Sequence, residues 1–357
     1  MDLTSLGWNP QRATEFAPYA ERGLLPARVS LEHTHIYRLL AAEGEMLARV
    51  AGRLRHRASA RTDYPAVGDW VAVEPDPHGG EARIHEVLSR TSRFSRRAAG
   101  DVTEEQIVAA NIDTVFLVAG LDHNFNPRRL ERYLTVAGES GASPVIVLNK
   151  ADLVDDPEAY VRQARALAPG VPVYAVSCEA PATLAALFEH LGFGRTGALL
   201  GSSGVGKSTI VNRLIGYDLL QTRDVRDWDS RGRHTSTRRE LVMLRDRGVL
   251  IDTPGMRELQ LWETGEALSG TFADIDALAE GCRFRDCRHT SEPGCAVLAA
   301  IEAGALVAGR LESFHKLAAE QQHQARQQDE RARIEEKRRG RIGAKALRKR
   351  LGEKGKA

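Results

Sequence analysis

The spacing of hydrophobic and polar residues divides the chain into three parts. Residues 44–57, GEMLARVAGRLRHR, and residues 66–75, AVGDWVAVEP, alternate apolar with polar positions, and glycine, proline and aspartate turn signals separate such runs. Alternation with a period of two is the pattern of strands that bury one face. The first hundred residues are therefore predicted to form a small β-barrel, for which the five-stranded OB type is a fitting form.

From about Asp101 the pattern changes to apolar strands that alternate with amphipathic helices. TVFLVAG at 114–120, PRRLERYLTVAGES at 127–140 and PVIVLNK at 144–150 predict a strand, a helix and a strand. The same alternation continues in three further segments, at residues 156–168, 171–177 and 181–191. Strands of this kind form a mostly parallel sheet with helices on both faces. Residues 101–262 are therefore predicted to be an α/β domain.

The last part of the chain changes character again. A cluster of cysteine and histidine residues is followed by helical patterns at 296–304 and 311–325. Residues 263–357 are therefore predicted to form a third, helical domain, and residues 1–100 form the barrel that precedes the α/β domain. The prediction for the whole chain is a multidomain α/β protein.

Composition indicates the compartment. Hydrophobic residues make up 42% and charged residues 27% of the chain, as in soluble globular proteins. The N-terminal MDLTSLGWNPQR lacks the apolar core of a signal peptide, and no apolar run approaches the ~20 residues that span a bilayer. We therefore expect a cytoplasmic protein with no membrane partner.

Basic residues gather at the C-terminal end. Residues 321–357 hold 13 lysines and arginines against 5 acidic residues, a charge of +8, so the rest of the chain carries −6 of the net +2. A basic tail on a mildly acidic body suggests a polyanionic partner such as nucleic acid. The alternative is a solvated, partly helical tail with no partner.

The segment GSSGVGKS, from Gly201 to Ser208, fits the phosphate-loop pattern G-x-x-x-x-G-K-[ST]. It follows the apolar run ALL and opens a helical pattern, which is the context that this motif requires. The glycines let backbone N–H groups turn toward phosphate oxygens, Lys207 can reach the β- and γ-phosphates, and the Ser208 hydroxyl can ligate Mg²⁺. The candidate GTP-binding residues of this segment are Gly201, Ser202, Ser203, Gly204, Val205, Gly206, Lys207, Ser208 and Thr209.

A second polar motif follows the apolar run VIVL. Asn149, Lys150 and Asp152 form the pattern N-K-x-D, in which the aspartate carboxylate can accept from both N1–H and the N2 amino group of guanine. Adenine offers no such pair of donors. Ser177 and Cys178, at the end of a later apolar run, are a candidate second loop against the base. These residues predict a site for GTP and GDP.

Two further segments suit the γ-phosphate. VLIDTPG ends an apolar run in Asp252, whose carboxylate can hold the hydration shell of Mg²⁺, and Gly255 can bring the backbone close to the γ-phosphate. Upstream of this segment, the polar, glycine-containing stretch RDWDSRGRHTSTRREL is a candidate switch, and the alternative is an ordinary surface loop. It offers Thr235 or Thr237 as a ligand of Mg²⁺.

Met256 occupies the position at which many GTPases have a glutamine that orients the attacking water. A thioether cannot do this job, so hydrolysis is expected to be slow and to depend on another group. His234 is the best internal candidate for a catalytic group, because it is titratable and adjacent to a proposed Mg²⁺ ligand. The alternative is a loop histidine with no role.

The order of these motifs along the chain is informative. The base-reading motif comes first, the phosphate loop second and the motif at Asp252 last. A doubly wound sheet needs only that its strand-end loops meet at one rim, and chain termini often lie close enough to be joined. The order therefore predicts a circularly permuted P-loop GTPase domain.

The segment GCRFRDCRHTSEPGC holds Cys282, Cys287, His289 and Cys295. Three thiolates and one imidazole make a closed tetrahedral set, which favours one structural Zn²⁺ over a catalytic site with an open position. A disulfide would leave one of these cysteines unpaired and does not suit the cytoplasm. The sequence therefore predicts a zinc-binding C-terminal domain.

Taken together, these motifs resemble the ribosome small-subunit-dependent GTPase A family, also called RsgA or YjeQ. The resemblance covers nearly the whole chain and is carried by AVGDWVAVE, QIVAANIDTVFLVAGLDHNFNPRRLERYL, NKAD, GSSGVGKST, GRHTST, DTPGMRE and the Cys/Cys/His/Cys cluster. It implies an RNA-binding OB-fold domain, a permuted GTPase domain and a zinc-binding domain. It also implies a factor that acts late in assembly of the small (30S) ribosomal subunit, binds rRNA and is released on ribosome-stimulated hydrolysis. We expect a monomer.

The resemblance also assigns a residue role and shows two departures from the family. His234 lies where the family has its proposed catalytic histidine. Ser236 stands where threonine is common, which leaves open whether Thr235, Ser236 or Thr237 ligates Mg²⁺. Cys178 stands where alanine is common. One other reading is an RNA scaffold with a structural nucleotide, against which the intact Lys207, Ser208 and Asp252 argue. A further reading is a permuted GTPase of the large subunit, against which the barrel and the zinc spacing argue.

Overall fold

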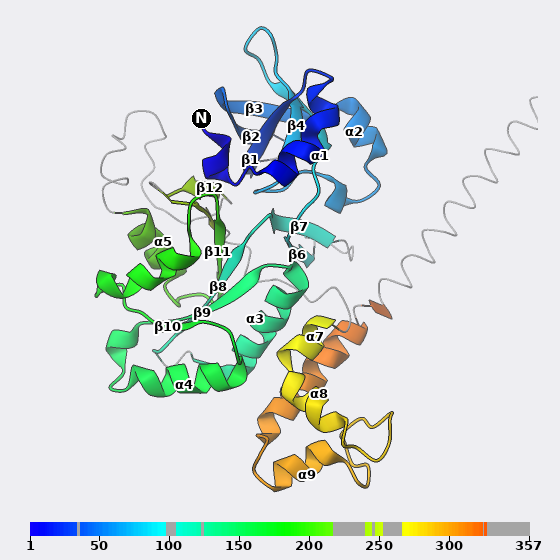
Figure 1. Ribbon diagram of the computed structural model, residues 1–357, viewed down its shortest axis with the longest axis vertical. Coiled ribbons are helices and arrows are strands. Elements are labelled where there is room, and N and C mark those ends of the chain that lie inside the picture. Colours follow the sequence, from blue (N-terminus) through cyan, green and yellow to red (C-terminus); the bar gives the residue numbers. More distant parts are fainter. Residues whose placement is uncertain are drawn as a thin grey trace, which may run out of the picture.

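The computed structural model describes residues 1–33, 36–97, 105–122, 125–216, 240–244, 247–252, 266–323 and 325–326. A β-barrel, a sheet layered with helices and a small helical unit follow one another along the long axis of the molecule (Figure 1). No helix of the described residues is long and apolar enough to cross a membrane.

The N-terminal part is a closed five-stranded barrel. Its strands pair in the order β1-β2-β3-β5-β4 and β4 returns to β1; the β3–β5 pairing is parallel and the other four are antiparallel. This topology confirms the predicted OB-type barrel. The strands are β1 Leu25–His33, β2 Ile36–Ala41, β3 Gly44–Val50, β4 Trp70–Glu74 and β5 Ala82–Val87.

Short helices flank the barrel. The 3₁₀ turn η1 (Leu3–Leu6) and helix α1 (Pro10–Ala20) precede it, and helix α2 (Gly52–Arg57) lies between β3 and β4. Helix α1 begins at a proline whose fixed φ suits the first turn, and the side chain of Asn9 caps it. The barrel interior is filled by small and branched apolar side chains such as those of Val29 and Ile84.

The middle part is a mostly parallel sheet in the order β10-β9-β8-β11-β13-β12, in which only β12 is antiparallel to its neighbour. The strands are β8 Thr114–Gly120, β9 Ser143–Asn149, β10 Val173–Ala175, β11 Thr196–Gly201, β12 Glu240–Met243 and β13 Val249–Asp252. Because the strands from β8 to β11 are joined by helical connections and pair in parallel, the α/β prediction is confirmed for this part of the chain.

Helices cover both faces of this sheet, and the alternation of side chains along β8 shows how. Val115 and Leu117 pack in one core with the apolar face of α3 and α4, whereas Phe116 and Val118 pack in a separate core with α5 and η4. The helical elements are α3 Pro127–Ser140, α4 Pro157–Leu167, the 3₁₀ helix η4 Pro181–His190 and α5 Lys207–Ile215.

The barrel and the sheet are joined by strand pairing and by a buried polar network. β1 pairs with β12 at Leu31 and Glu240, and a two-stranded ribbon of β6 (Arg93–Arg97) and β7 (Glu105–Ala110) lies between the two bodies.

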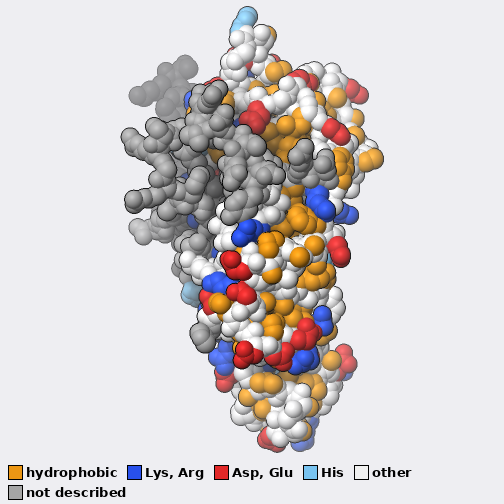
Figure 2. Space-filling model, turned by 90° about the vertical axis from the view of Figure 1, so that its left-hand side faces the viewer, with side chains coloured by type: hydrophobic (Ala, Val, Ile, Leu, Met, Phe, Trp, Pro, Cys, Tyr) orange, Lys and Arg blue, Asp and Glu red, His pale blue; other side chains and the backbone are white. Residues whose placement is uncertain are grey.

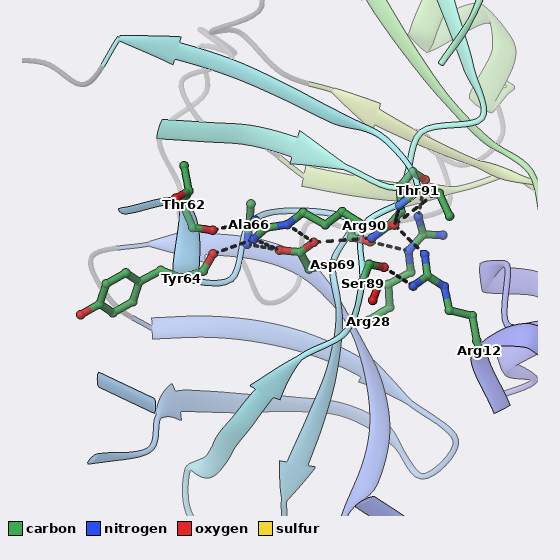
Figure 3. Close-up of polar contacts among 11 residues, drawn as sticks. Arg12, Arg28, Thr62, Tyr64, Ala66, Asp69, Ser89, Arg90 and Thr91 are labelled. Carbon is green, nitrogen blue, oxygen red and sulfur yellow. Dashed lines mark hydrogen bonds and ion pairs between the residues drawn. The ribbon is translucent and has the colours of Figure 1, made fainter. Parts of the chain in front are cut away.

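Arg28 on β1 is fully buried in this junction. Its guanidinium donates to the carbonyls of Leu6, Gly68 and Asn111 and, at 2.9 Å, to Thr196 Oγ1 at the start of β11. Figure 3 shows Arg28 together with the neighbouring contacts of Arg90, which pairs with Asp69 and donates to the carbonyls of Thr62 and Tyr64. Burial lowers the pKa of Arg28 to about 10, which still leaves it charged at neutral pH.

The C-terminal unit is helical. It contains α7 (Glu266–Thr271), α8 (Ala273–Ala279), α9 (Ala296–Glu302) and a longer helix over residues 308–323, and α7 packs against α3 of the sheet layer. On the face of the molecule shown in Figure 2, acidic and basic side chains of the described residues are interspersed.

Candidate nucleotide site and metal centre

The phosphate loop lies between β11 and α5. β11 ends at Gly201 and α5 begins at Lys207. Gly204 and Gly206 have φ values of 79° and 93°, which L-residues rarely adopt. A Cβ on Gly201 would lie 2.4 Å from the carbonyl oxygen of Val118, so the loop also needs glycine where it passes β8. The motif therefore adopts the strand–loop–helix context that it predicts.

The side chain of Lys207 turns back over the loop. Its Nζ donates to the carbonyl oxygens of Gly201 and Ser202, both at 2.7 Å. Ser203 and Gly204 are exposed on this loop, and Ser208 and Thr209 are exposed in the first turn of α5. An ammonium group, hydroxyl groups and the glycine-rich backbone thus gather at one end of α5, which suits the binding of phosphate oxygens.

The candidate base-reading motif begins at Asn149, the last residue of β9, and touches the phosphate loop. Asn149 is 2% exposed, and its Nδ2 donates to the carbonyl oxygen of Val205 at 2.8 Å. A Cβ on Gly206 would lie 2.2 Å from the same Nδ2. Two motifs that are more than fifty residues apart in sequence are therefore interlocked, as the permuted order of the chain requires.

The second candidate loop lies against the first. Ser177 is buried and its hydroxyl donates to the carboxylate of Asp152. The Cys178 thiol lies 3.7 Å from Asn149 Oδ1, and burial raises its pKa, so this cysteine is a buried thiol as expected rather than a reactive one. The structure thus brings together the four predicted side chains Asn149, Asp152, Ser177 and Cys178.

Lys150 has a partner that the sequence did not reveal. Its backbone has a φ of 64°, and its ammonium group forms an ion pair with Asp122, which lies just after the end of β8. Asp122 is at the same rim of the sheet as the base-reading and phosphate loops, so the rule that ligands bind at the carboxyl ends of parallel strands could have found it.

The γ-phosphate side of the site is described only in part. Asp252 ends β13, the parallel neighbour of β11, and so lies at the same rim of the sheet. Gly255, His234, Thr235, Ser236, Thr237 and Met256 lie outside the described residues.

The four predicted metal ligands converge in the C-terminal unit. The ligand atoms of Cys282, Cys287, His289 and Cys295 all lie within 4.8 Å of one another. Cys282 Sγ lies 3.9 Å from Cys295 Sγ and 3.6 Å from His289 Nδ1. A tetrahedral ion with metal–sulfur bonds of ~2.3 Å separates its sulfurs by ~3.8 Å, so these residues fit such an ion.

Three groups of this cluster have shifted pKa values, and the shifts differ in direction. Burial lowers the pKa of His289, which leaves the imidazole neutral and able to ligate. Burial alone would raise the pKa of Cys282, yet the backbone N–H groups of Ala296 and Val297 hold it below its usual range. Burial and the neighbouring cysteines raise the pKa of Cys287 to about 11, a shift that a bound cation would reverse.

A carboxylate braces the loop that carries His289. Glu292 accepts from the backbone N–H groups of Arg288, Thr290 and Ser291 at 2.9, 2.8 and 3.0 Å. These hydrogen bonds lower the pKa of Glu292 to about 2. The loop is thus held in shape by a charged group that ligates no metal.

Comparison with known proteins identifies the family. The model of the RsgA GTPase family matches residues 87–262. A curated relative from Opitutus terrae, "Small ribosomal subunit biogenesis GTPase RsgA", is 49% identical over 338 residues, which cover 92% of each chain. The chain belongs to the RsgA GTPase family. A relative of the same name from Streptomyces coelicolor is 45% identical and covers 98% of this chain and 96% of its own.

Solved structures of RsgA-type proteins share the fold. YjeQ from Thermotoga maritima superimposes with a TM-score of 0.61 at 25% identity and covers 84% of this chain and 98% of its own. YloQ, described as a circularly permuted GTPase, superimposes with a TM-score of 0.59 at the same identity and covers 84% and 96%. The chain is accordingly a GTPase with a permuted order of motifs, as the sequence predicted.

Proposed function

We propose that this RsgA-family GTPase is a late maturation factor of the small (30S) ribosomal subunit, which binds rRNA in its GTP state and leaves after hydrolysis. The observation that carries the proposal is the interlock of Asn149 with Val205 and Gly206, which joins a guanine-reading loop to a phosphate loop. The names of two curated relatives, both small ribosomal subunit biogenesis GTPases, support the small subunit as the partner.

In the proposed guanine pocket, the Asp152 carboxylate accepts from N1–H and the N2 amino group of the base. Ser177 Oγ, which donates to that carboxylate, orients it. Asn149 has both ends of its amide engaged, with Val205 and Cys178, so its role is to brace the two loops rather than to read the base. The stem of Lys150 covers the face of the base while its ammonium group stays with Asp122.

At the phosphates, the proposed ligands are the backbone N–H groups from Ser202 to Thr209 and the Lys207 ammonium group. Lys207 Nζ now lies on two carbonyl oxygens of its own loop and would exchange them for phosphate oxygens. Ser208 and Thr235 would hold Mg²⁺ directly and Asp252 through water, while Gly255 would approach the γ-phosphate. Mg²⁺ supplies charge neutralisation between the β- and γ-phosphates when bound.

For hydrolysis we propose His234 as the group that orients water, because Met256 cannot. Stimulation by the small subunit would then consist of placing His234 against the attacking water. This assignment predicts slow turnover by the isolated protein.

We further propose three functional domains, with the RNA-binding barrel at 1–100, the GTPase at 101–262 and the metal-binding unit at 263–357. The metal of Cys282, Cys287, His289 and Cys295 is proposed to be one structural Zn²⁺, since the site is closed. The protein would act as a monomer in the cytoplasm, where ribosomal subunits mature.

Co-sedimentation with purified small subunits tests this function. The affinity in the presence of a non-hydrolysable GTP analogue is expected to exceed that with GDP by at least about tenfold, because a ligand shifts an equilibrium only by its differential affinity. Lys207→Ala is the matched control and should lose the difference. Equal affinities for the two nucleotide states of the unchanged protein would contradict the proposal.

A further inference from the structure

Helix α3 contacts both the phosphate loop and the C-terminal unit. It starts soon after β8, with Asn126 as its N-cap and Pro127 as its first residue. Its 14 residues rise ~1.5 Å each, so it extends ~21 Å away from the rim of the sheet. A helix of this length connects two sites without a flexible joint between them.

At the rim, α3 reaches the phosphate loop through Arg129. The Nη1 atom of Arg129 donates to Ser202 Oγ at 3.0 Å. The carbonyl oxygen of the same Ser202 accepts from Lys207 Nζ at 2.7 Å. Two cationic side chains therefore meet on one residue of the loop, and Arg129 comes from outside the phosphate-loop motif.

A neighbouring stripe of α3 holds the C-terminal unit. Residue 128 lies three positions before residue 131 and four positions before residue 132. All three residues therefore share one side of the helix. Each forms an ion pair with the helix over residues 308–323, and the pairs are Arg128–Glu312, Glu131–Arg310 and Arg132–Glu320.

The central pair of this stripe is buried. The side chains of Glu131 and Arg310 are 2% and 9% exposed and lie 2.8 Å apart. Arg310 also donates to the Asp274 carboxylate and stacks on Phe272 at 4.9 Å, so it is held from both sides. Breaking such a pair leaves a buried charge without compensation. Removing one partner of this pair while the unit stays docked is therefore costly, so Arg310 is a sensitive position at which to test the contact.

Arg128 and Arg129 are consecutive residues of one helical turn. A change in docking that shifts the backbone at Arg128 therefore also shifts Arg129. We propose that Arg129 is a positioning residue, through which docking of the C-terminal unit on α3 sets the shape of the phosphate loop at Ser202. This inference rests on the proposed function, because it requires GTP in that loop. By linkage, binding of the terminal phosphate strengthens the docking in turn.

The test is a double-mutant cycle between Arg129→Gln and Arg310→Gln in the full chain. The readouts are affinity for a non-hydrolysable GTP analogue, affinity for GDP, and kcat and KM for GTP. Arg129→Gln should weaken analogue binding about tenfold, the usual effect of losing a charge-assisted hydrogen bond, and GDP binding by less than about threefold. Arg129→Lys should restore part of the loss.

The coupling is measured by the double variant. Residues that act independently multiply their effects, whereas Arg310→Gln should weaken analogue binding about threefold alone and add almost nothing to Arg129→Gln. Arg128→Gln removes the exposed Arg128–Glu312 pair and gives a second docking variant. In each variant, retained metal content shows that the C-terminal unit is folded. Arg162→Gln on α4 is the control for loss of an arginine.

Multiplied effects in the double variant, or wild-type analogue affinity in Arg129→Gln, would overturn this inference. A wild-type protein that does not bind GTP would instead overturn the proposed function.

Discussion

Replacing Gly206 with alanine adds one methyl group where the phosphate loop meets the base-reading loop. The new Cβ would lie 2.2 Å from Asn149 Nδ2, well inside van der Waals contact. Gly206 also has a φ of 93°, which an alanine adopts only with strain. The substitution therefore disrupts the contact that joins the two loops of the proposed nucleotide site.

The free-energy cost of Gly206→Ala to nucleotide binding is the sum of two contributions. Strain at a positive φ costs ~1–2 kcal/mol for a residue with a Cβ. Displacing the Asn149 amide breaks its 2.8 Å hydrogen bond to the carbonyl of buried Val205, and a buried acceptor without a donor costs ~1–3 kcal/mol. The total of ~2–5 kcal/mol opposes the nucleotide-competent arrangement of both loops, which corresponds to GDP binding weaker by ~30-fold to ~4,000-fold.

Titration with a fluorescent GDP analogue measures this loss, and circular dichroism reports whether the variant is folded. Gly170→Ala is the matched control, because Gly170 has a φ of 83° in a loop after α4 with no atom within 4 Å of the added Cβ. It should lower stability by ~1–2 kcal/mol and leave GDP affinity unchanged. Folded Gly206→Ala protein that binds GDP within threefold of the wild type would refute the interlock.

Three further outcomes are expected. Asp152→Asn should turn the nucleotide preference from GTP to xanthosine triphosphate in competition binding. The new amide N–H would face the N2 amino group of guanine, which is also a donor, whereas xanthine has a carbonyl acceptor at that position. Retained preference for GTP would contradict the assigned role. Cys282→Ser, like chelation, should release the bound metal and expose residues 266–323 to hydrogen exchange, and an unchanged exchange pattern would deny a structural metal. Arg90→Met should lower the free energy of unfolding by ~3–5 kcal/mol, because it leaves the fully buried Asp69 carboxylate without its bidentate partner, while exposed Arg83→Met should cost almost nothing.

The parts of this molecule that follow from local chemistry could be predicted from the sequence. The phosphate loop depends on glycines at positive φ, and Gly204 and Gly206 occupy those positions. The candidate metal ligands lie within fourteen residues, so their convergence needs only one folded loop. The barrel and the α/β sheet followed from alternation with period two and from strand–helix alternation.

The parts that depend on long-range packing could not be predicted. Nothing near Arg129 in the sequence indicates Ser202 as its partner, and the residues of the Arg310–Glu131 pair are further apart still along the chain. The pairing of β1 with β12, which joins the barrel to the sheet, involves strands about 200 residues apart. The segment from Pro181 was expected to continue the helical alternation and adopts a 3₁₀ helix, because apolar spacing does not distinguish the two helix types.

Hydrolysis of GTP and ATP by the purified full chain, with and without purified ribosomal subunits, tests the central claim most directly. The account predicts slow GTP turnover by the isolated protein, strong acceleration by small but not by large subunits, and no comparable turnover of ATP. Turnover that small subunits leave unchanged, or that does not distinguish GTP from ATP, would contradict it.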